Sequence, residues 1–182
     1  MDSHRERSVV PILLITGPVG VGKTSVLSEV TELLEAARLP FAAVDLDNLS
    51  WCYPSPSGDD RFRSGLTFKN LAAVWRNFED AGARRLVIAR VVESRDELDR
   101  YRAAVPGAEI TLVRLGASDV TLHERVGKRE IGLGHEWHAR RATELSRLMD
   151  EAKIEDLLVD TDGRTVNEIA HEILQRTGWL RE

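Results

Sequence analysis

A glycine-rich loop near the N-terminus constrains the fold more than any other segment. It lies between Val9–Thr16, an apolar run of strand length, and Lys23–Arg38, whose apolar residues recur at helical spacing. The loop completes the pattern G-x-x-x-x-G-K-T with Gly17, Pro18, Val19, Gly20, Val21, Gly22, Lys23 and Thr24. A strand, this pattern and then a helix form the arrangement in which backbone N–H groups cradle phosphates.

The composition of this loop suits a nucleoside triphosphate. Glycines let the backbone bend until several N–H groups converge on one phosphate, and the start of the next helix adds a positive dipole. Lys23 can reach the β- and γ-phosphates, and the hydroxyl of Thr24 can ligate Mg²⁺. We therefore predict a site for ATP and Mg²⁺ that extends to Ser25. The alternative is a glycine turn that carries an incidental lysine.

Apolar segments of strand length alternate with helical patterns along the rest of the chain. Strands are expected over Val9–Thr16, Phe41–Asp45, Arg85–Val92, Ile110–Leu115 and Glu155–Asp160. Capping boxes that begin at Ser94 and Thr165 predict two helix starts. Strands separated by helices favour the α/β class, with a parallel sheet covered on both faces.

The length and composition indicate one globular domain. Of the 182 residues, 42% are hydrophobic and 30% are charged, which excludes a disordered chain. We expect residues 1–8 to be a flexible tail and residues 9–182 to be a single domain. No apolar run is long enough for a bilayer, and the net charge of -5 argues against nucleic acid. We expect a cytoplasmic monomer or homodimer without membrane or nucleic-acid partners.

Two carboxylates follow the second expected strand. Alternation along that strand would place Asp45 and Asp47 on the same side, at the sheet edge where ligands bind. Like charges placed together need a cation, and Mg²⁺ beside a phosphate loop supplies one. Asp45 could then act through metal-bound water, while Asp47 accepts the proton of an attacking hydroxyl. The alternative is a pair of ordinary loop acids.

These features resemble the small P-loop kinases, which include shikimate kinase, gluconate kinase and nucleoside monophosphate kinases. The segment VDLDNLSW is also similar to chloramphenicol phosphotransferase. The resemblance implies a three-layer P-loop NTPase fold whose five-stranded parallel sheet has the order 2-3-1-4-5. It also implies that Asp47 is the general base and that Asp45 lies near the metal. The chain departs from motor-type ATPases because its third strand ends without an Asp.

A basic, glycine-containing stretch, Gly127–Arg141, interrupts the alternation of strands and helices. Arg125 and Arg129 are one helical turn apart and share a face. The resemblance implies a lid at about residues 125–141 whose arginines close over the transferring phosphate. The alternative is a solvated basic helix.

Candidates for binding the acceptor come from the loop Tyr53–Thr67, its surroundings and the end of the third strand. They are Arg63, Asn70, Arg90 and Glu93, of which Arg63 suits an anionic group and Asn70 or Glu93 suits hydroxyls. Cys52 is expected to be a buried free thiol. In the resembling kinases the turn after the last strand packs beside the nucleotide base, which assigns Arg164 to the nucleotide.

The sequence thus predicts an ATP-dependent phosphotransferase that moves the γ-phosphoryl group to a hydroxyl of a small molecule. The predicted catalytic residues are Lys23, Asp47, Arg125 and Arg129. Two alternatives stay open. One is a regulatory module that binds or hydrolyses nucleotide without a small-molecule acceptor, and the other is a nucleoside monophosphate kinase.

Overall fold

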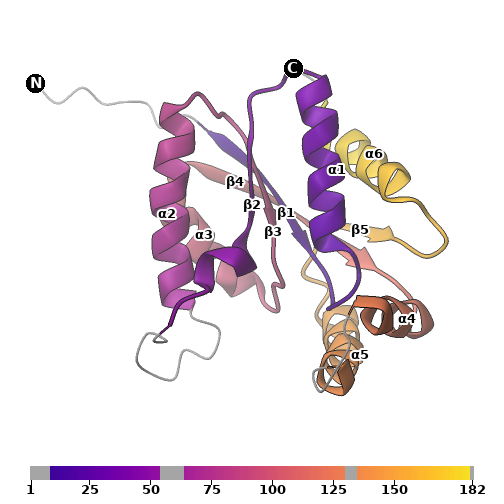
Figure 1. The fold of residues 1–182 in the computed structure, drawn as a ribbon. Helices are drawn as coiled ribbons and strands as arrows, with labels where there is room; N and C mark the ends of the chain where they lie inside the picture. The colour runs from indigo at the N-terminus through magenta and orange to yellow at the C-terminus, as the bar shows by residue number, and fades with distance from the viewer. Residues whose placement is uncertain (1–8, 54–63, 130–134, 181–182) are drawn as a thin grey trace, which may run out of the picture.

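A five-stranded sheet forms the centre of the computed structural model (Figure 1), which describes residues 9–53, 64–129 and 135–180. Its strands are β1 Val10–Thr16, β2 Ala42–Asp45, β3 Leu86–Ala89, β4 Ala108–Gly116 and β5 Leu157–Asp160. All neighbouring strands are parallel, in the order β2-β3-β1-β4-β5. The α/β class and the implied strand order are confirmed. The tail expected over residues 1–8 lies outside the described residues.

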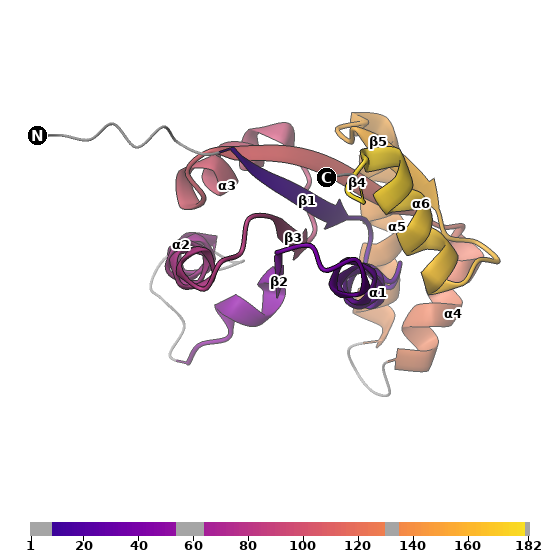
Figure 2. The same cartoon turned by 90° about the horizontal axis from the view of Figure 1, so that it is seen from above.

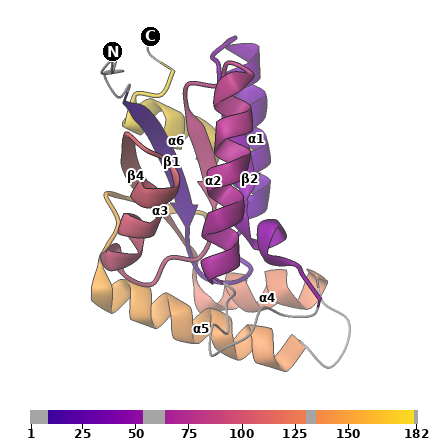
Figure 3. The same ribbon diagram turned by 90° about the vertical axis from the view of Figure 1, so that its left-hand side faces the viewer.

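Helices cover both faces of the sheet. They are α1 Lys23–Ala36, α2 Ser64–Asp80, α3 Leu98–Ala104, α4 Asp119–Arg129, α5 His135–Ala152 and α6 Val166–Thr177, with short 3₁₀ helices η1 Leu46–Ser50 and η2 Arg95–Glu97. Figures 1 and 2 show α1 and α6 on one side of the sheet and α2 and α3 on the other. Beyond the carboxyl end of β1, α4 and α5 lie together (Figure 3). None of the helices within the described ranges is both long and apolar enough to cross a membrane.

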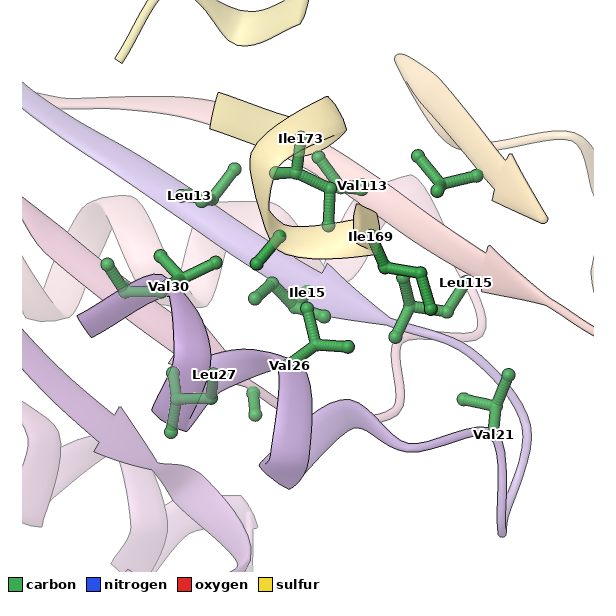
Figure 4. Close-up of a cluster of buried hydrophobic side chains, with 14 of the residues drawn as sticks. Leu13, Ile15, Val21, Val26, Leu27, Val30, Val113, Leu115, Ile169 and Ile173 are labelled. Carbon is green, nitrogen blue, oxygen red and sulfur yellow. The ribbon is translucent and has the colours of Figure 1, made fainter. Parts of the chain in front are cut away.

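The central strand contributes to a core on each face. Leu13 and Ile15 of β1 pack in the cluster with α1 and α6, part of which Figure 4 shows. Ile12 and Leu14 point the other way, into the cluster with α2 and α3. This is why β1 is a continuous apolar run, since a parallel strand covered on both faces has no solvent side. Trp75 of α2 belongs to the second of these clusters and is 2% exposed.

Helix starts follow the capping residues more closely than the apolar spacing. Both predicted capping boxes are present, at Ser94 before η2 and α3 and at Thr165 before α6. Two loop predictions were too long. Ser64 begins α2 inside the expected loop, and His135 begins α5 inside the basic stretch. Polar and glycine residues at those helix starts conceal the helical pattern.

The carboxyl ends of three strands meet at one edge of the sheet. Ala89, the last residue of β3, pairs with Ile15 of β1 and with Asp45 of β2. The Arg90 N–H then donates to the Ile15 carbonyl over 3.1 Å, and the Val92 N–H donates to the buried Thr16 hydroxyl over 2.9 Å. The chain that leaves β3 is therefore fastened to the residues just before the glycine loop.

Candidate active site

The glycine loop joins β1 to α1 at this edge. Lys23 lies at the start of α1, and its Nζ donates to the carbonyls of Gly17 and Pro18, at 3.0 Å each. The helix ladder begins at the loop itself, because the N–H of Val26 donates to the carbonyl of Gly22 over 2.9 Å. The lysine thus lies over the loop, with the N-terminus of α1 at the same place. This arrangement presents positive charge and helix dipole together.

Close packing against α4 explains one glycine of the loop. Gly20 has φ of +82°, and a Cβ on it would lie 2.6 Å from Cγ2 of Val126. Gly22 also has a positive φ, +106°, but a Cβ there would meet nothing within 4 Å. Position 20 therefore requires glycine for both backbone conformation and space, whereas position 22 requires it for conformation alone.

The acidic pair is fixed by hydrogen bonds to the chain around it. The Thr24 hydroxyl donates to Oδ2 of Asp45 over 2.8 Å, and the Asp47 N–H donates to Oδ1 of Asp45 over 3.2 Å. Strand alternation was the wrong reason for expecting the two acids together. Asp45 ends β2 and caps η1, so Asp47 stands on a 3₁₀ turn. Both acids nevertheless line the same pocket as the glycine loop.

That pocket has a volume of about 810 Å³ and contains most of the predicted nucleotide site. It is lined by Val19, Gly20, Val21, Gly22, Lys23, Thr24, Ser25, Asp45, Asp47, Arg125 and Arg164, among others. The volume fits a ligand of nucleotide size. The glycine loop, the first turn of α1, the end of β2, α4 and the turn before α6 therefore all contribute residues to one cavity.

The donors present suit a magnesium ion that arrives with a nucleotide. Within the described part of the chain no group of three or more His, Cys, Asp or Glu residues is placed to hold a metal alone. The Thr24 hydroxyl nonetheless meets the Asp45 carboxylate, and Asp47 lines the same pocket. Mg²⁺ prefers oxygen ligands and keeps several from water and phosphate. The donor set therefore fits Mg²⁺ bound through phosphates with little direct protein ligation.

Two arginines mark the end of the pocket near β5. Arg125 of α4 donates to the Val21 carbonyl at 3.0 Å and to Oγ1 and O of Thr161 at 2.9 and 3.1 Å. Arg164 donates to the Asp160 carbonyl and pairs with Glu172 at 2.6 Å. These contacts link the glycine loop to the turn between β5 and α6. Arg129 ends α4, but its side chain is not among those described.

The predicted acceptor residues have varied surroundings. Asn70 of α2 donates from Nδ2 to the Leu49 carbonyl over 2.7 Å, so this amide fixes η1. Glu93 pairs with Arg141 of α5 at 2.5 Å. Arg90 is 8% exposed and lies over the ring of Phe68, and Arg63 falls outside the described residues. Cys52 is exposed, so the expectation of a buried thiol was wrong.

Sequence reasoning missed three polar side chains beside the site. They are Thr16, which accepts from Val92; Thr161, which accepts from Arg125; and Tyr101, whose buried hydroxyl bonds to none of the described residues. Thr16 adjoins the glycine motif and could have been suspected from that position. Tyr101 sits at a core position of α3, where an aromatic residue gives no functional signal.

Comparison with known structures identifies the fold. A gluconokinase from Sinorhizobium meliloti 1021 is 23% identical, with 96% of this chain and 95% of that chain covered and a TM-score of 0.59. The tunicamycin resistance protein of Deinococcus radiodurans is 19% identical, with 93% of this chain and 96% of that chain covered and a TM-score of 0.64. APS kinase of Mycobacterium tuberculosis, in complex with AMPPNP and APS, is 21% identical, with 93% of this chain and 98% of that chain covered and a TM-score of 0.62. Neither the protein-family models nor the curated protein sequences give a match.

The fold is that of the small P-loop kinases. The sheet order, the helices on both faces and the loop between β1 and α1 all belong to this architecture. The likeness extends over nearly the whole of each compared chain.

Proposed function

We propose that this protein is an ATP-dependent phosphotransferase that acts on a hydroxyl of a small molecule. The observation that carries the proposal is the Thr24–Asp45 hydrogen bond beside a complete phosphate loop, with Asp47 on the next turn. The structural neighbours described as kinases support phosphoryl transfer as the type of reaction. This argument concerns the type of reaction and does not use the identity of the acceptors of those proteins.

In this proposal the glycine loop and the N-terminus of α1 bind the β- and γ-phosphates. Lys23 leaves the carbonyls of Gly17 and Pro18, which it bonds at 3.0 Å, and turns toward the phosphate oxygens. Arg125 and Arg164 stay bonded near β5, where they form the wall for the base and ribose. The lid, at about residues 125–141, begins at the fixed Arg125, and its later part with Arg129 closes over the γ-phosphate and excludes water.

Asp47 acts on the acceptor. Its carboxylate orients the acceptor hydroxyl in line with the γ-phosphorus and takes the hydroxyl proton. The hydroxyl oxygen forms the new bond to phosphorus as the bond to the β,γ-bridging oxygen breaks, and ADP leaves with that electron pair. Thr24 and Asp45 would supply oxygens to a Mg²⁺ ion that arrives with the nucleotide, and the ion would neutralise part of the phosphate charge. The chain itself contributes positioning, charge and exclusion of water.

The test separates nucleotide binding from transfer. We expect Lys23→Ala to abolish transfer, because no other residue of α1 supplies its charge to the phosphates. We expect Asp47→Asn to lower turnover by about 10²-fold or more with ATP affinity nearly unchanged, because only the proton acceptor is lost. Release of ADP in the presence of hydroxyl compounds measures turnover, and calorimetry measures ATP binding.

The controls are exposed residues of the same types. Lys69→Ala and Asp80→Asn, both on α2, should retain full activity. Full transfer by Asp47→Asn would remove that residue from the mechanism. Binding and slow hydrolysis without a phosphorylated product would favour a regulatory module. Tight competition by a bisubstrate dinucleotide would favour a nucleoside monophosphate kinase.

A further inference from the structure

Arg90 is a buried cation that forms no ion pair with any residue that the structure describes. It follows β3 directly and is 8% exposed, and its Nη1 has no solvent contact and no hydrogen bond to a described residue. Its Cζ lies 5.4 Å from the centroid of the Phe68 ring. Among the described residues no carboxylate pairs with it. A buried guanidinium in this condition costs free energy, which a cation–π contact only partly offsets.

A second unpartnered polar group lies beside the first. The hydroxyl of Tyr101 is fully buried and bonds to no residue in the described ranges, and the Tyr101 ring meets the Phe68 ring edge-on with 4.8 Å between centroids. Phe68 therefore contacts both Arg90 and Tyr101. Burial raises the pKa of Tyr101 above its ordinary value of 10.0, so its hydroxyl remains a donor. Arg90 acts against this pKa shift, and the charges of Glu97 and Asp47 add to it.

The acidic groups nearby are engaged elsewhere. The Glu97 carboxylate accepts the N–H groups of Glu93 and Ser94 at 2.8 and 3.2 Å. Glu93 itself pairs with Arg141. Asp47 lines the nucleotide pocket, as does Val91, the neighbour of Arg90. The cluster of Arg90, Phe68 and Tyr101 thus adjoins the proposed transfer site without a carboxylate of its own.

Only an acceptor of hydrogen bonds can satisfy Arg90, because a guanidinium has no lone pair to offer. An oxyanion also supplies the missing charge and can receive a second bond from the phenol. We propose that Arg90 and Tyr101 bind an oxyanionic group, a carboxylate, phosphate or sulfate, on the acceptor. The acceptor is then an acidic hydroxyl compound and not a neutral polyol. This inference deepens the proposed function and rests on it.

Binding requires a local change. Nη1 is shielded from solvent, so the Arg90 side chain must rotate or Phe68 must shift for an anion to reach it. Arg90 retains its backbone bond to Ile15 throughout, which keeps the site in register with β1. The guanidinium then gains charge-assisted hydrogen bonds in exchange for its contact with the Phe68 ring.

The first experiment measures anion binding on protein saturated with AMPPNP and Mg²⁺, so that the phosphate loop is occupied. Sodium sulfate is titrated against chloride at constant ionic strength, with melting temperature and heat as readouts. We expect saturable stabilisation that is weakened about 10-fold or more by Arg90→Met and less by Arg90→Lys. Arg100→Met is the control, because it removes the same charge from an exposed position on α3. This variant should bind sulfate as the natural protein does.

Tyr101→Phe separates a ligand contact from a structural one. An unpartnered buried hydroxyl contributes nothing favourable, so its removal should leave the melting temperature without sulfate unchanged or higher. The same change should lower sulfate affinity several-fold. A clear loss of stability without sulfate would show that the hydroxyl serves the fold and would overturn its assignment.

The second experiment compares matched acceptors, D-gluconate with D-sorbitol and D-glycerate with glycerol, by ADP release. Preference for the acidic member, lost in Arg90→Met through a raised KM, supports the inference. Absence of saturable sulfate binding, or sulfate binding that persists in Arg90→Met, would overturn the inference. Turnover of sorbitol and glycerol without turnover of gluconate and glycerate would also overturn it. Turnover of neutral members leaves the proposed function intact, whereas failure of AMPPNP to bind removes the proposed function itself.

Discussion

The hydrogen bond between Thr24 and Asp45 orients two oxygens before any ligand arrives. Thr24 lies in the first turn of α1 and Asp45 ends β2, yet their side chains meet at 2.8 Å. Both side chains are thereby held in one rotamer each, which lowers the entropy lost when a phosphate-bound cation is added. This preorganisation depends on two individual side chains. The requirement for glycine at two positions of the loop likewise depends on individual residues.

Gly20→Ala and Gly22→Ala separate conformational strain from steric conflict. Each alanine would need a positive φ, which costs roughly 1 kcal/mol. Only the alanine at 20 would also collide with Val126, at 2.6 Å. We expect Gly20→Ala to lower the melting temperature clearly more than Gly22→Ala, as differential scanning calorimetry can measure. The double variant Gly20→Ala/Val126→Ala should recover part of the difference, and equal losses in the two single variants would contradict the packing argument.

At the level of elements, local chemistry made some boundaries predictable and concealed others. The helix after Thr165 could be predicted because Thr165 and Glu168 satisfy each other's N–H groups within four residues. The acidic pair was predicted for the wrong reason, because η1 depends on Asn70, which donates to the Leu49 carbonyl from a distant helix. The start of α5 at His135 could not be predicted, because the first turns of this helix contain mostly polar and basic residues and few apolar ones that would reveal a helical spacing.

The last helix allows a prediction of pH dependence. Glu172 of α6 has a pKa below its ordinary value of 4.5, chiefly because of its hydrogen bond from Arg176, with Arg164 adding to the effect against the cost of burial. Because the folded-state pKa is depressed, this stabilisation is present above 4.5 and is lost as the pH falls through the folded-state value. Glu172→Gln should therefore be less stable than the natural protein at about pH 7, and the difference should shrink as the pH falls below 4.5 and through the folded-state pKa.

Urea denaturation at a series of pH values from about 7 downward measures this difference. Glu32→Gln on α1 is the control, because Glu32 is exposed and makes no ion pair with any described residue. A Glu172→Gln deficit that stays constant over the whole pH range would show that shape and not charge is responsible.

At the scale of the whole molecule, one ion pair connects the proposed lid to the acceptor side. Arg141 on α5 reaches Glu93 after β3, 48 residues away in the sequence. The α/β class and strand order were predictable because they follow from alternating elements and the glycine motif. The Arg141–Glu93 ion pair could not be predicted, because the sequence around an arginine does not indicate which distant carboxylate it will pair with. Cytoplasmic location and the monomeric or homodimeric state stay predictions.

Arg141→Met should loosen that connection. We expect faster amide hydrogen exchange in the segment after β3 and in α5, with a stability change of at most about 1 kcal/mol because the pair is partly exposed. Arg147→Met is the matched control, since the ion pair that Arg147 makes among the described residues is with Glu151 of the same helix. Exchange after β3 that is equally fast in both variants would show that the Glu93 contact does not restrain that segment.

The two backbone bonds that fasten the chain after β3 have a geometric consequence. Arg90 is bonded through its N–H to Ile15, and Val92 to Thr16, one residue before the glycine loop. The span between the phosphate cradle and the root of the Arg90 side chain is thus set by a single rigid strand pair. Such a span works as a ruler. It would admit hydroxy acids whose reactive oxygen and charged end are the right length apart, and reject homologues that are longer or shorter.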